Sequence, residues 1–225
     1  MQLLETKNPV IRLHLLFTPL ALIFFLLPLS LGKSIFFSVV LYHVLFLFFI
    51  QYYKLTEWKW IYFYLAPLSF FLVFPDLFLS NFLGVLVFPN SGFFHWISVS
   101  DYMAGMWVIP LFLTLQIGKE ISKKYSDTLG SITAAVFAII LFSLSEEFCA
   151  LIPIWYAKNV RMISHVAIYV IIPEGILGYS VFWIYEKVKG NIGMSFVGSF
   201  LTSMIYTGSL VFFYYFLQSF KLYFN

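Results

Sequence analysis

The chain has 225 residues, of which 62% are hydrophobic and 10% are charged, with a net charge of +3. Soluble domains carry about 25% charged residues, so this composition excludes a soluble globular protein, and the small positive charge reflects loop asymmetry rather than nucleic-acid binding. Apolar runs of about 20 residues recur throughout, which predicts an all-α, polytopic membrane helix bundle with about seven transmembrane helices. We expect a single domain over residues 1–225.

The first three spans are predicted over about residues 14–31, 34–53 and 60–88. The first is read as a retained helix, because it contains Pro19 and Pro28 and lacks a small-residue cleavage site. The third is too long for one straight helix. We therefore expect a kink at Pro75, followed by a half-length or interfacial segment.

Four further spans are predicted after a loop over residues 89–101, in which Asp101 is expected to cap the next helix. They cover about residues 102–117, 131–152, 163–185 and 192–217. The most charged loop, residues 118–130, separates the first two of these spans, and residues 218–225 form a tail.

Lysine and arginine are divided unequally between the two ends of these spans. The N-terminal side carries Lys7, Arg12, Lys54, Lys59, Lys119, Lys123, Lys124, Lys187 and Lys189, and the other side carries Lys33, Lys158, Arg161 and Lys221. Since cytoplasmic loops carry an excess of Lys and Arg, the N-terminus is predicted to be cytoplasmic and the C-terminus outside. The expected location is the inner membrane of a bacterium.

Acidic residues within the apolar spans are the strongest functional signal. A charge at bilayer depth costs at least about 2.5 kcal/mol, so such residues are retained for a role or paired with a partner. Glu174 lies in the middle of the sixth span, Glu146 and Glu147 near the end of the fifth, and Asp76 in the third. By depth, these acids fall in one zone that leans toward the outer face.

We expect these four acids to be catalytic candidates. A carboxyl in an apolar medium favours its neutral form, so Glu174 is expected to donate a proton. Glu146 or Glu147, together with Asp76, would orient it or accept the final proton. The alternative is that each acid is structural and bonded to a neighbouring helix. Only one of Glu146 and Glu147 can face a given interior point, because adjacent helical residues point about 100° apart.

Aromatic and histidine side chains near these acids are candidates for substrate binding: Trp155, Tyr156, His165, His43, Trp107 and Tyr169. The alternative for the Trp-Tyr pair is anchorage at the membrane interface. Neither His43 nor His165 has a second ligand three or four residues away, so no metal site is predicted. The chain has no Gly-rich phosphate loop, Cys-pair motif or nucleophile elbow, and no cofactor is predicted.

A short internal similarity predicts an internal three-helix repeat. The segment Met-Trp-Val-Ile-Pro at residues 106–110 is similar to Ile-Tyr-Val-Ile-Ile-Pro at residues 168–173, a separation of about 63 residues. Each segment follows a span that carries an acid. Repeats of this kind place binding sites at the interface between the two units.

Residues 143–185 carry an acid, a Trp-Tyr pair and then a Pro-Glu pair within a helix: Glu147, Trp155-Tyr156 and Pro173-Glu174. This order resembles the integral-membrane lycopene cyclase domain of bacteria and fungi. That family's pattern ends in Pro-x-Glu-Glu followed by Phe. In this chain Glu174 occupies the x position, and Gly175 and Ile176 stand where the two glutamates would be.

The resemblance implies protonation of an isoprenoid double bond by a buried carboxylic acid, without a redox change. Aromatic rings would then stabilise the carbocation. A second comparison is with membrane proteases that carry a Glu-Glu-x-x-x-Arg motif. Glu146-Glu147 begins such a motif, but Leu151 stands where the arginine is required.

These observations lead to the hypothesis of an integral-membrane enzyme that acts on an apolar isoprenoid-like or lipid substrate by acid–base chemistry of the cyclase or isomerase type. The alternative is a small-molecule or proton-coupled transporter or binding protein, in which the same acids form a proton or cation site. A scaffold subunit with purely structural acids is a third reading. The expected partner is a membrane lipid or an apolar small molecule.

Overall fold

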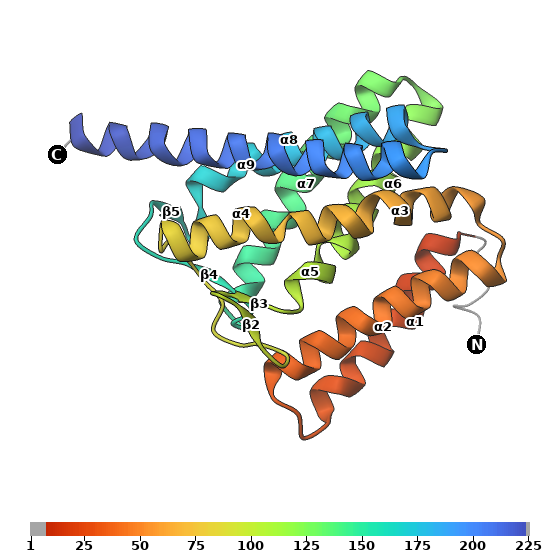
Figure 1. Ribbon diagram of the computed structural model, residues 1–225, viewed down its shortest axis with the longest axis horizontal. Helices are drawn as coiled ribbons and strands as arrows, with labels where there is room; N and C mark the ends of the chain where they lie inside the picture. Colours follow the sequence, from red (N-terminus) through yellow and green to blue (C-terminus); the bar gives the residue numbers. More distant parts are fainter. Residues whose placement is uncertain (1–7, 224–225) are drawn as a thin grey trace.

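The computed structural model describes residues 8–223, with side chains described as far as Leu217. Its architecture is the predicted all-α helical bundle (Figure 1). Within the described residues, 6 helices are long and apolar enough to cross a membrane. They are α1 (Pro9–Leu26), α2 (Leu31–Tyr52), the segment Thr56–Phe82, α7 (Asp127–Cys149), α8 (Ile168–Val188) and α9 (Ile192–Tyr223), of which Ile192–Leu217 is the apolar part.

The predicted span over residues 102–117 is divided into two helices. α5 (Met103–Met106) and α6 (Val108–Lys124) meet at Trp107, and α6 has 17 residues. Together they run back along the bundle against α7 (Figure 1). α6 extends beyond the predicted end of the span because its last turn is built from polar residues, with Lys123 and Lys124 at a helix C-terminus, where positive charge is favourable.

The third span bends earlier than predicted. α3 (Thr56–Phe71) ends at Leu72, and Pro75 lies inside the next short helix, α4 (Val73–Leu77). Proline has no N–H and its ring crowds the preceding turn, so the break falls just before the proline rather than at it. A π-helical turn, η2 (Phe78–Phe82), follows. The remaining apolar residues to 88 form a loop with the short strand β1 (Leu86–Val87) rather than a half-length helix.

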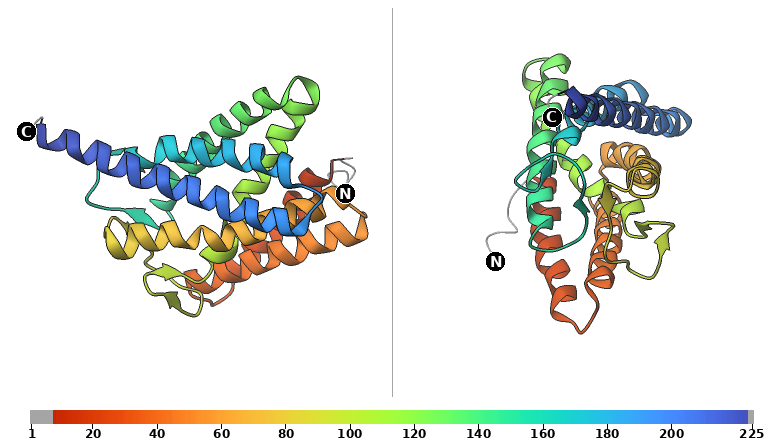
Figure 2. Two further views of the ribbon diagram at one scale, coloured as in Figure 1. Left: turned by 45° about the horizontal axis from the view of Figure 1, so that its top comes forward. Right: turned by 90° about the vertical axis from the view of Figure 1, so that its left-hand side faces the viewer.

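Short strands gather at the end of the bundle where η2 finishes and α8 begins (Figure 2). β1 pairs in antiparallel fashion with β4 (Tyr156–Ala157), which joins the loop before α5 to the loop after α7. Tyr102 strengthens the same junction, since its hydroxyl donates to the carbonyl oxygens of Asn90 and Ile154, both at 3.1 Å. We call these two joined loops the loop cap.

The loop cap changes two predictions. The sixth span begins at Ile168 and not at residue 163, because β5 (Met162–Ile163) and β6 (Val166–Ala167) form a hairpin there. Asp101 does not cap a helix: its carboxylate accepts backbone N–H groups of the preceding loop, from Gly92 at 2.7 Å and Phe93 at 2.8 Å.

A matching hairpin precedes α5. There β2 (His95–Trp96) pairs with β3 (Val99–Ser100), and both hairpins turn on a residue with positive φ, Ile97 at 59° and Ser164 at 55°. Such a φ is uncommon outside glycine, so its occurrence at corresponding places is informative. The internal repeat stays a prediction, and the shared hairpin supports it.

Close packing and buried hydroxyls hold the helices in register. A Cβ built on Gly178 of α8 would lie 2.5 Å from the Ala134 carbonyl oxygen of α7, so only glycine permits this approach. On the other side α9 bonds to α3: the Tyr64 and Thr202 hydroxyls are 2.6 Å apart, and Ser199 donates to the Tyr64 carbonyl oxygen at 2.6 Å.

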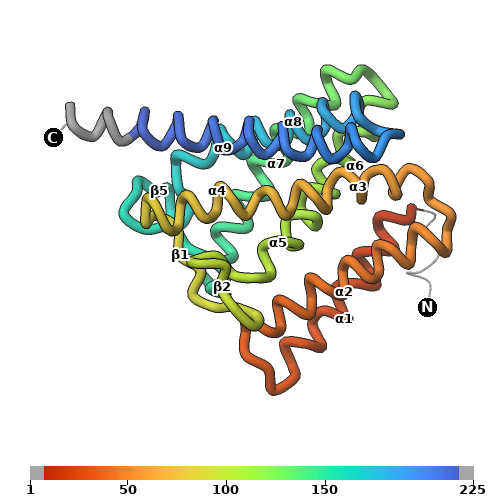
Figure 3. Tube along the Cα trace, viewed as in Figure 1, coloured from red at the N-terminus to blue at the C-terminus, as the bar shows by residue number. Residues whose placement is uncertain are grey.

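α1 and α2 form a hairpin at the N-terminal end of the trace (Figure 3). Lys7 and the side chain of Lys221, which entered the charge count, lie outside the described residues.

Candidate functional site

A cavity of about 550 Å³ lies beneath the loop cap, among α4, α5, α6, α7, α8 and α9. We call it the chamber. Its wall is largely apolar, and seven aromatic side chains contribute to it: Phe88, Trp107, Phe142, Phe148, Trp155, Tyr169 and Tyr206. The volume falls in the range of about 300–1,000 Å³ that small-molecule sites occupy.

Three of the four predicted acids lie in the chamber wall. They are Asp76 from α4, Glu146 from α7 and Glu174 from α8, so separate helices bring them together. Asp76 is 4% exposed and Glu174 is 5% exposed. Carboxyl groups are rarely buried so deeply without a partner or a function.

Glu174 is the acid without a partner. Its Oε2 atom is buried and makes no hydrogen bond within the described part of the chain. The preceding Pro173 lies inside α8 and has no N–H to give to the carbonyl of Tyr169 one turn earlier. In the part of α8 that lines the chamber, the unpaired Glu174 carboxyl therefore follows a proline that interrupts the backbone hydrogen bonds of the helix.

Asp76 is held by Trp107. The indole Nε1–H of Trp107 donates to Asp76 Oδ2 at 3.2 Å. The indole also packs against Phe142 and Tyr206, with ring centroids 5.2 Å and 6.1 Å away. The break between α5 and α6 at Trp107 turns this side chain toward the acid, so one predicted substrate-binding residue has a defined place in the chamber.

Glu146 and Glu147 point to different environments, as their adjacency on a helix requires. Glu146 Oε2 accepts the backbone N–H of Ala167 at 2.8 Å, at the edge of the chamber. Glu147 lies outside the chamber, where its Oε1 accepts the backbone N–H of His165 at 3.1 Å and its Oε2 lies 2.9 Å from the His165 ring. Glu147 therefore fastens the β5–β6 hairpin to the end of α7 instead of facing the other acids.

The remaining predicted substrate-binding residues separate into two groups. Trp155 and Tyr169 line the chamber. Tyr156 and His165 do not: both are exposed and line a smaller cavity of about 190 Å³ under the β5–β6 hairpin. The unbroken apolar sequence predicts His165 inside the sixth helix, but the β5–β6 hairpin places it on the surface.

His43 also lies away from the chamber. Its ring nitrogens are occupied, with Nδ1 2.9 Å from the Tyr62 hydroxyl and Nε2 3.1 Å from the Gly105 carbonyl oxygen. His43 thus links α2 to α3 and to α5, which is a structural role. Within the described residues no group of three or more His, Cys, Asp or Glu side chains is placed to hold a metal ion.

The sequence reading missed Tyr206 of α9, a buried residue in the chamber wall that is 4% exposed. A signal for it was available. Small hydroxyl residues recur every three or four positions along α9, at Ser195, Ser199, Thr202 and Ser203, and all are buried. Such a stripe marks the face of a membrane helix that packs on its neighbours, and Tyr206 continues it.

The chamber is bordered on one side by apolar side chains that face outward. Leu144 and Phe148 near the end of α7, and Ile152 in the loop that follows, line the chamber and are 56%, 65% and 40% exposed. The chamber therefore has an apolar border at the molecular surface.

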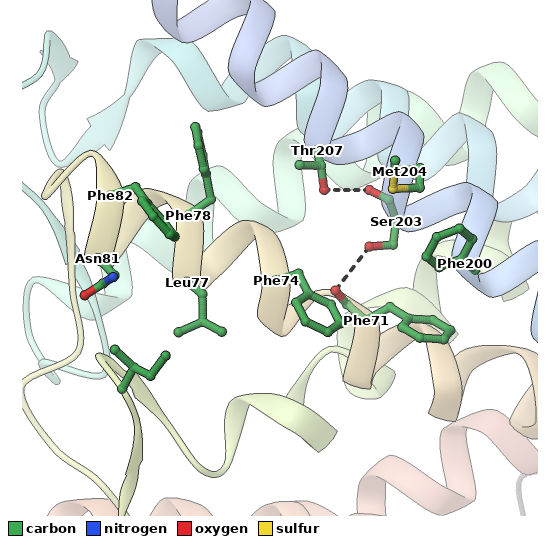
Figure 4. A pocket seen from close by; sticks show the side chains of 11 residues that line it. Phe71, Phe74, Leu77, Phe78, Asn81, Phe82, Phe200, Ser203, Met204 and Thr207 are labelled. Atoms are coloured by element: carbon green, nitrogen blue, oxygen red, sulfur yellow. Dashed lines mark hydrogen bonds between the residues drawn. The ribbon is translucent and has the colours of Figure 1, made fainter.

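A second cavity, of about 480 Å³, lies between the α3–α4–η2 segment and α9 (Figure 4). Phenylalanine side chains dominate it, and Ser203 there donates to the Phe71 carbonyl oxygen at 3.1 Å. The residues described in its lining include no acid. Its described polar lining residues are Asn81, Ser203 and Thr207, which are neutral, so the candidate acid–base chemistry belongs to the chamber.

The fold and the chamber define a polytopic helical membrane protein with an apolar cavity lined by carboxyl groups. The chain belongs to the family described as Domain of unknown function (DUF6989), whose model matches residues 73–217. This range includes all three chamber acids. Comparison with curated proteins and with solved structures gave no match. The resemblance to lycopene cyclase domains stays a prediction.

Proposed function

We propose that this protein is an integral-membrane enzyme that isomerises or cyclises an apolar, isoprenoid-like or lipid substrate by acid–base catalysis. The observation that carries the proposal is the buried, unpartnered carboxyl of Glu174 in an apolar chamber. A charged carboxylate would be strongly disfavoured there, so the group is suited to act as a neutral acid.

The chemistry requires no redox step. The Glu174 O–H would give its proton to one carbon of a C=C bond, whose electron pair forms the new C–H bond and leaves a carbocation. Either the electron pair of a second double bond in the substrate then forms a C–C bond to the cationic carbon and moves the positive charge to a new carbon, or the cation loses a proton from a neighbouring carbon. In both outcomes one proton finally leaves carbon, and Asp76 or Glu146 can accept it. The product is an isomer of the substrate.

The aromatic side chains of the chamber wall are suited to stabilise a carbocation intermediate. Trp107, Trp155, Tyr169 and Tyr206 all line the chamber. The negative face of an aromatic ring stabilises a cation by about 0.5–2 kcal/mol, more when water is excluded. The outward-facing apolar border gives such a substrate direct access from lipid.

The charge count supports an orientation with the N-terminus in the cytoplasm and the C-terminus outside, in the inner membrane of a bacterium. In that orientation the loop cap, and the chamber beneath it, lie toward the outer face. Attachment of a membrane-impermeant maleimide to a cysteine introduced at Asn159 in the loop cap of intact cells tests this. Labelling only after lysis would contradict the orientation.

The function is tested by expressing the protein in cells that accumulate squalene or lycopene and analysing extracted lipids for isomers of unchanged mass. Glu174→Gln keeps the shape but removes the acidic proton, and we expect a loss of about 10²–10⁴-fold in product formation. Glu147→Gln is the matched control, because Glu147 lies outside the chamber, and it should keep activity. Full activity of Glu174→Gln would exclude Glu174 as the acid. Proton-coupled uptake of a solute into vesicles, without product, would favour the transporter alternative.

A further inference from the structure

The chamber and the small cavity under the β5–β6 hairpin have two residues in common, Glu146 and Trp155. The small cavity opens at the surface, where Tyr156 is 46% exposed and the His165 side chain is 60% exposed. Glu146 therefore stands between a compartment that water reaches and a chamber that is largely apolar.

The carboxyl of Glu146 is held at this boundary. Its Oε2 accepts the Ala167 N–H at 2.8 Å, which ties α7 to the start of α8. Within the described residues Oε1 makes no hydrogen bond, so it remains available to carry a proton. Among titratable groups, Glu147 is its neighbour in α7 and His165 lines the small cavity with it. The titratable groups that line the chamber with it are Asp76, Cys149, Tyr169, Glu174 and Tyr206.

Glu174 lies deeper along the same helix. Seven residues separate it from Ala167 in α8, which corresponds to about 10 Å along the helix axis. Glu146 and Glu174 both line the chamber. Because about 10 Å exceeds the reach of one bridging water molecule, a proton would pass between them along a short chain of water molecules in the chamber.

We propose that Glu146 is a proton-relay residue that connects water at the hairpin surface with Glu174. The inference rests on the proposed function and concerns how that acid is reset. Each turnover transfers the Glu174 proton to carbon and releases another proton from carbon to an acceptor. Glu174 must regain a proton before the next turnover, and the apolar wall offers water no direct approach. Glu146 takes a proton from the hairpin side, or from carbon, and passes it to Glu174.

The relay can be measured without any substrate. A neutral glutamic acid gives an infrared C=O stretching band that shifts when its proton is replaced by deuterium. In purified protein, the band that Glu174→Gln removes is assigned to Glu174, and its rate of exchange after transfer to heavy water reports proton access.

The critical variant is Glu146→Gln, which still offers an oxygen to the Ala167 N–H but has no exchangeable carboxyl proton. We expect the Glu174 band to exchange about tenfold or more slowly in it, since losing an acid–base group commonly slows proton transfer by at least that factor. Glu147→Gln is the matched control and should exchange at the wild-type rate.

The outcomes separate the relay from the proposed function. An unchanged exchange rate in Glu146→Gln would refute the relay. Faster exchange would also refute it, because it would mean that Glu146 only seals the chamber. If Glu174→Gln removes no band, Glu174 is ionised, and the proposed function fails. If Glu146→Gln does not fold, Glu146→Asp supplies the comparison. Its carboxyl group lies on a shorter side chain, so the Glu174 proton should exchange more slowly than in the wild type. Exchange no slower than in wild-type protein would count against the relay.

Discussion

Replacing Glu174 by methionine should make the protein more stable and inactive at once. The Glu174 Oε2 atom is buried and has no hydrogen-bonding partner within the described residues. A buried polar atom in this condition costs about 1–3 kcal/mol. Methionine has a similar volume and no polar group to desolvate, so Glu174→Met should raise the free energy of unfolding by about 1–3 kcal/mol.

The assay is unfolding of purified protein in detergent, followed by tryptophan fluorescence. For a chain of this size each kcal/mol corresponds to about 2–4 °C in the midpoint. Glu146→Met is the matched control from the same chamber. It removes the acceptor of the Ala167 N–H, so we expect it to lower the stability by about 1–3 kcal/mol.

The structure predicts changes of opposite sign in the free energy of unfolding for Glu174→Met and Glu146→Met. If Glu174→Met were as destabilising as Glu146→Met, then Glu174 would have a stabilising partner in the folded protein. That result would refute the claim that Glu174 is an unpartnered acid. A gain in stability with loss of product would instead match the trade-off expected of an active-site group kept for function.

Further predictions concern packing, the loop cap and the Asp76 contact. Gly178→Ala should destabilise the protein by about 1–3 kcal/mol, because its Cβ would collide with α7. Gly208→Ala, where nothing lies within 4 Å, should be neutral or stabilise by up to about 1 kcal/mol. Equal midpoints of thermal unfolding for Gly178→Ala and Gly208→Ala would contradict this contrast. Asp101→Asn should cost about 1–3 kcal/mol and increase proteolysis within the loop cap, and unchanged protease resistance would argue against its role. Trp107→Phe keeps a ring but removes the donor to Asp76; we expect weaker product formation and a loss of about 1–3 kcal/mol, measured against the wild type, whereas wild-type values for both would show that the indole N–H is dispensable.

Hydropathy and charge gave the architecture and the rough depth of the acids, because a lipid environment forces backbone groups into helices and makes each span visible as an apolar run. The same signal could not reveal the β5–β6 hairpin. Its residues are apolar and continuous with α8, and a short apolar run reads alike as strand or helix. The apolar pattern therefore predicts His165 within the helix, whereas the structure places it on the surface with Glu147.

Sequence alone identified Asp76, Glu146 and Glu174 as acids in apolar surroundings, since composition around a residue is local information. Only the tertiary structure decided that these three share one chamber and that Glu147 does not. The direction of a side chain depends on how its helix is rotated about its axis. That rotation is set by contacts between helices, such as Gly178 against α7, which a linear pattern of hydrophobicity does not encode.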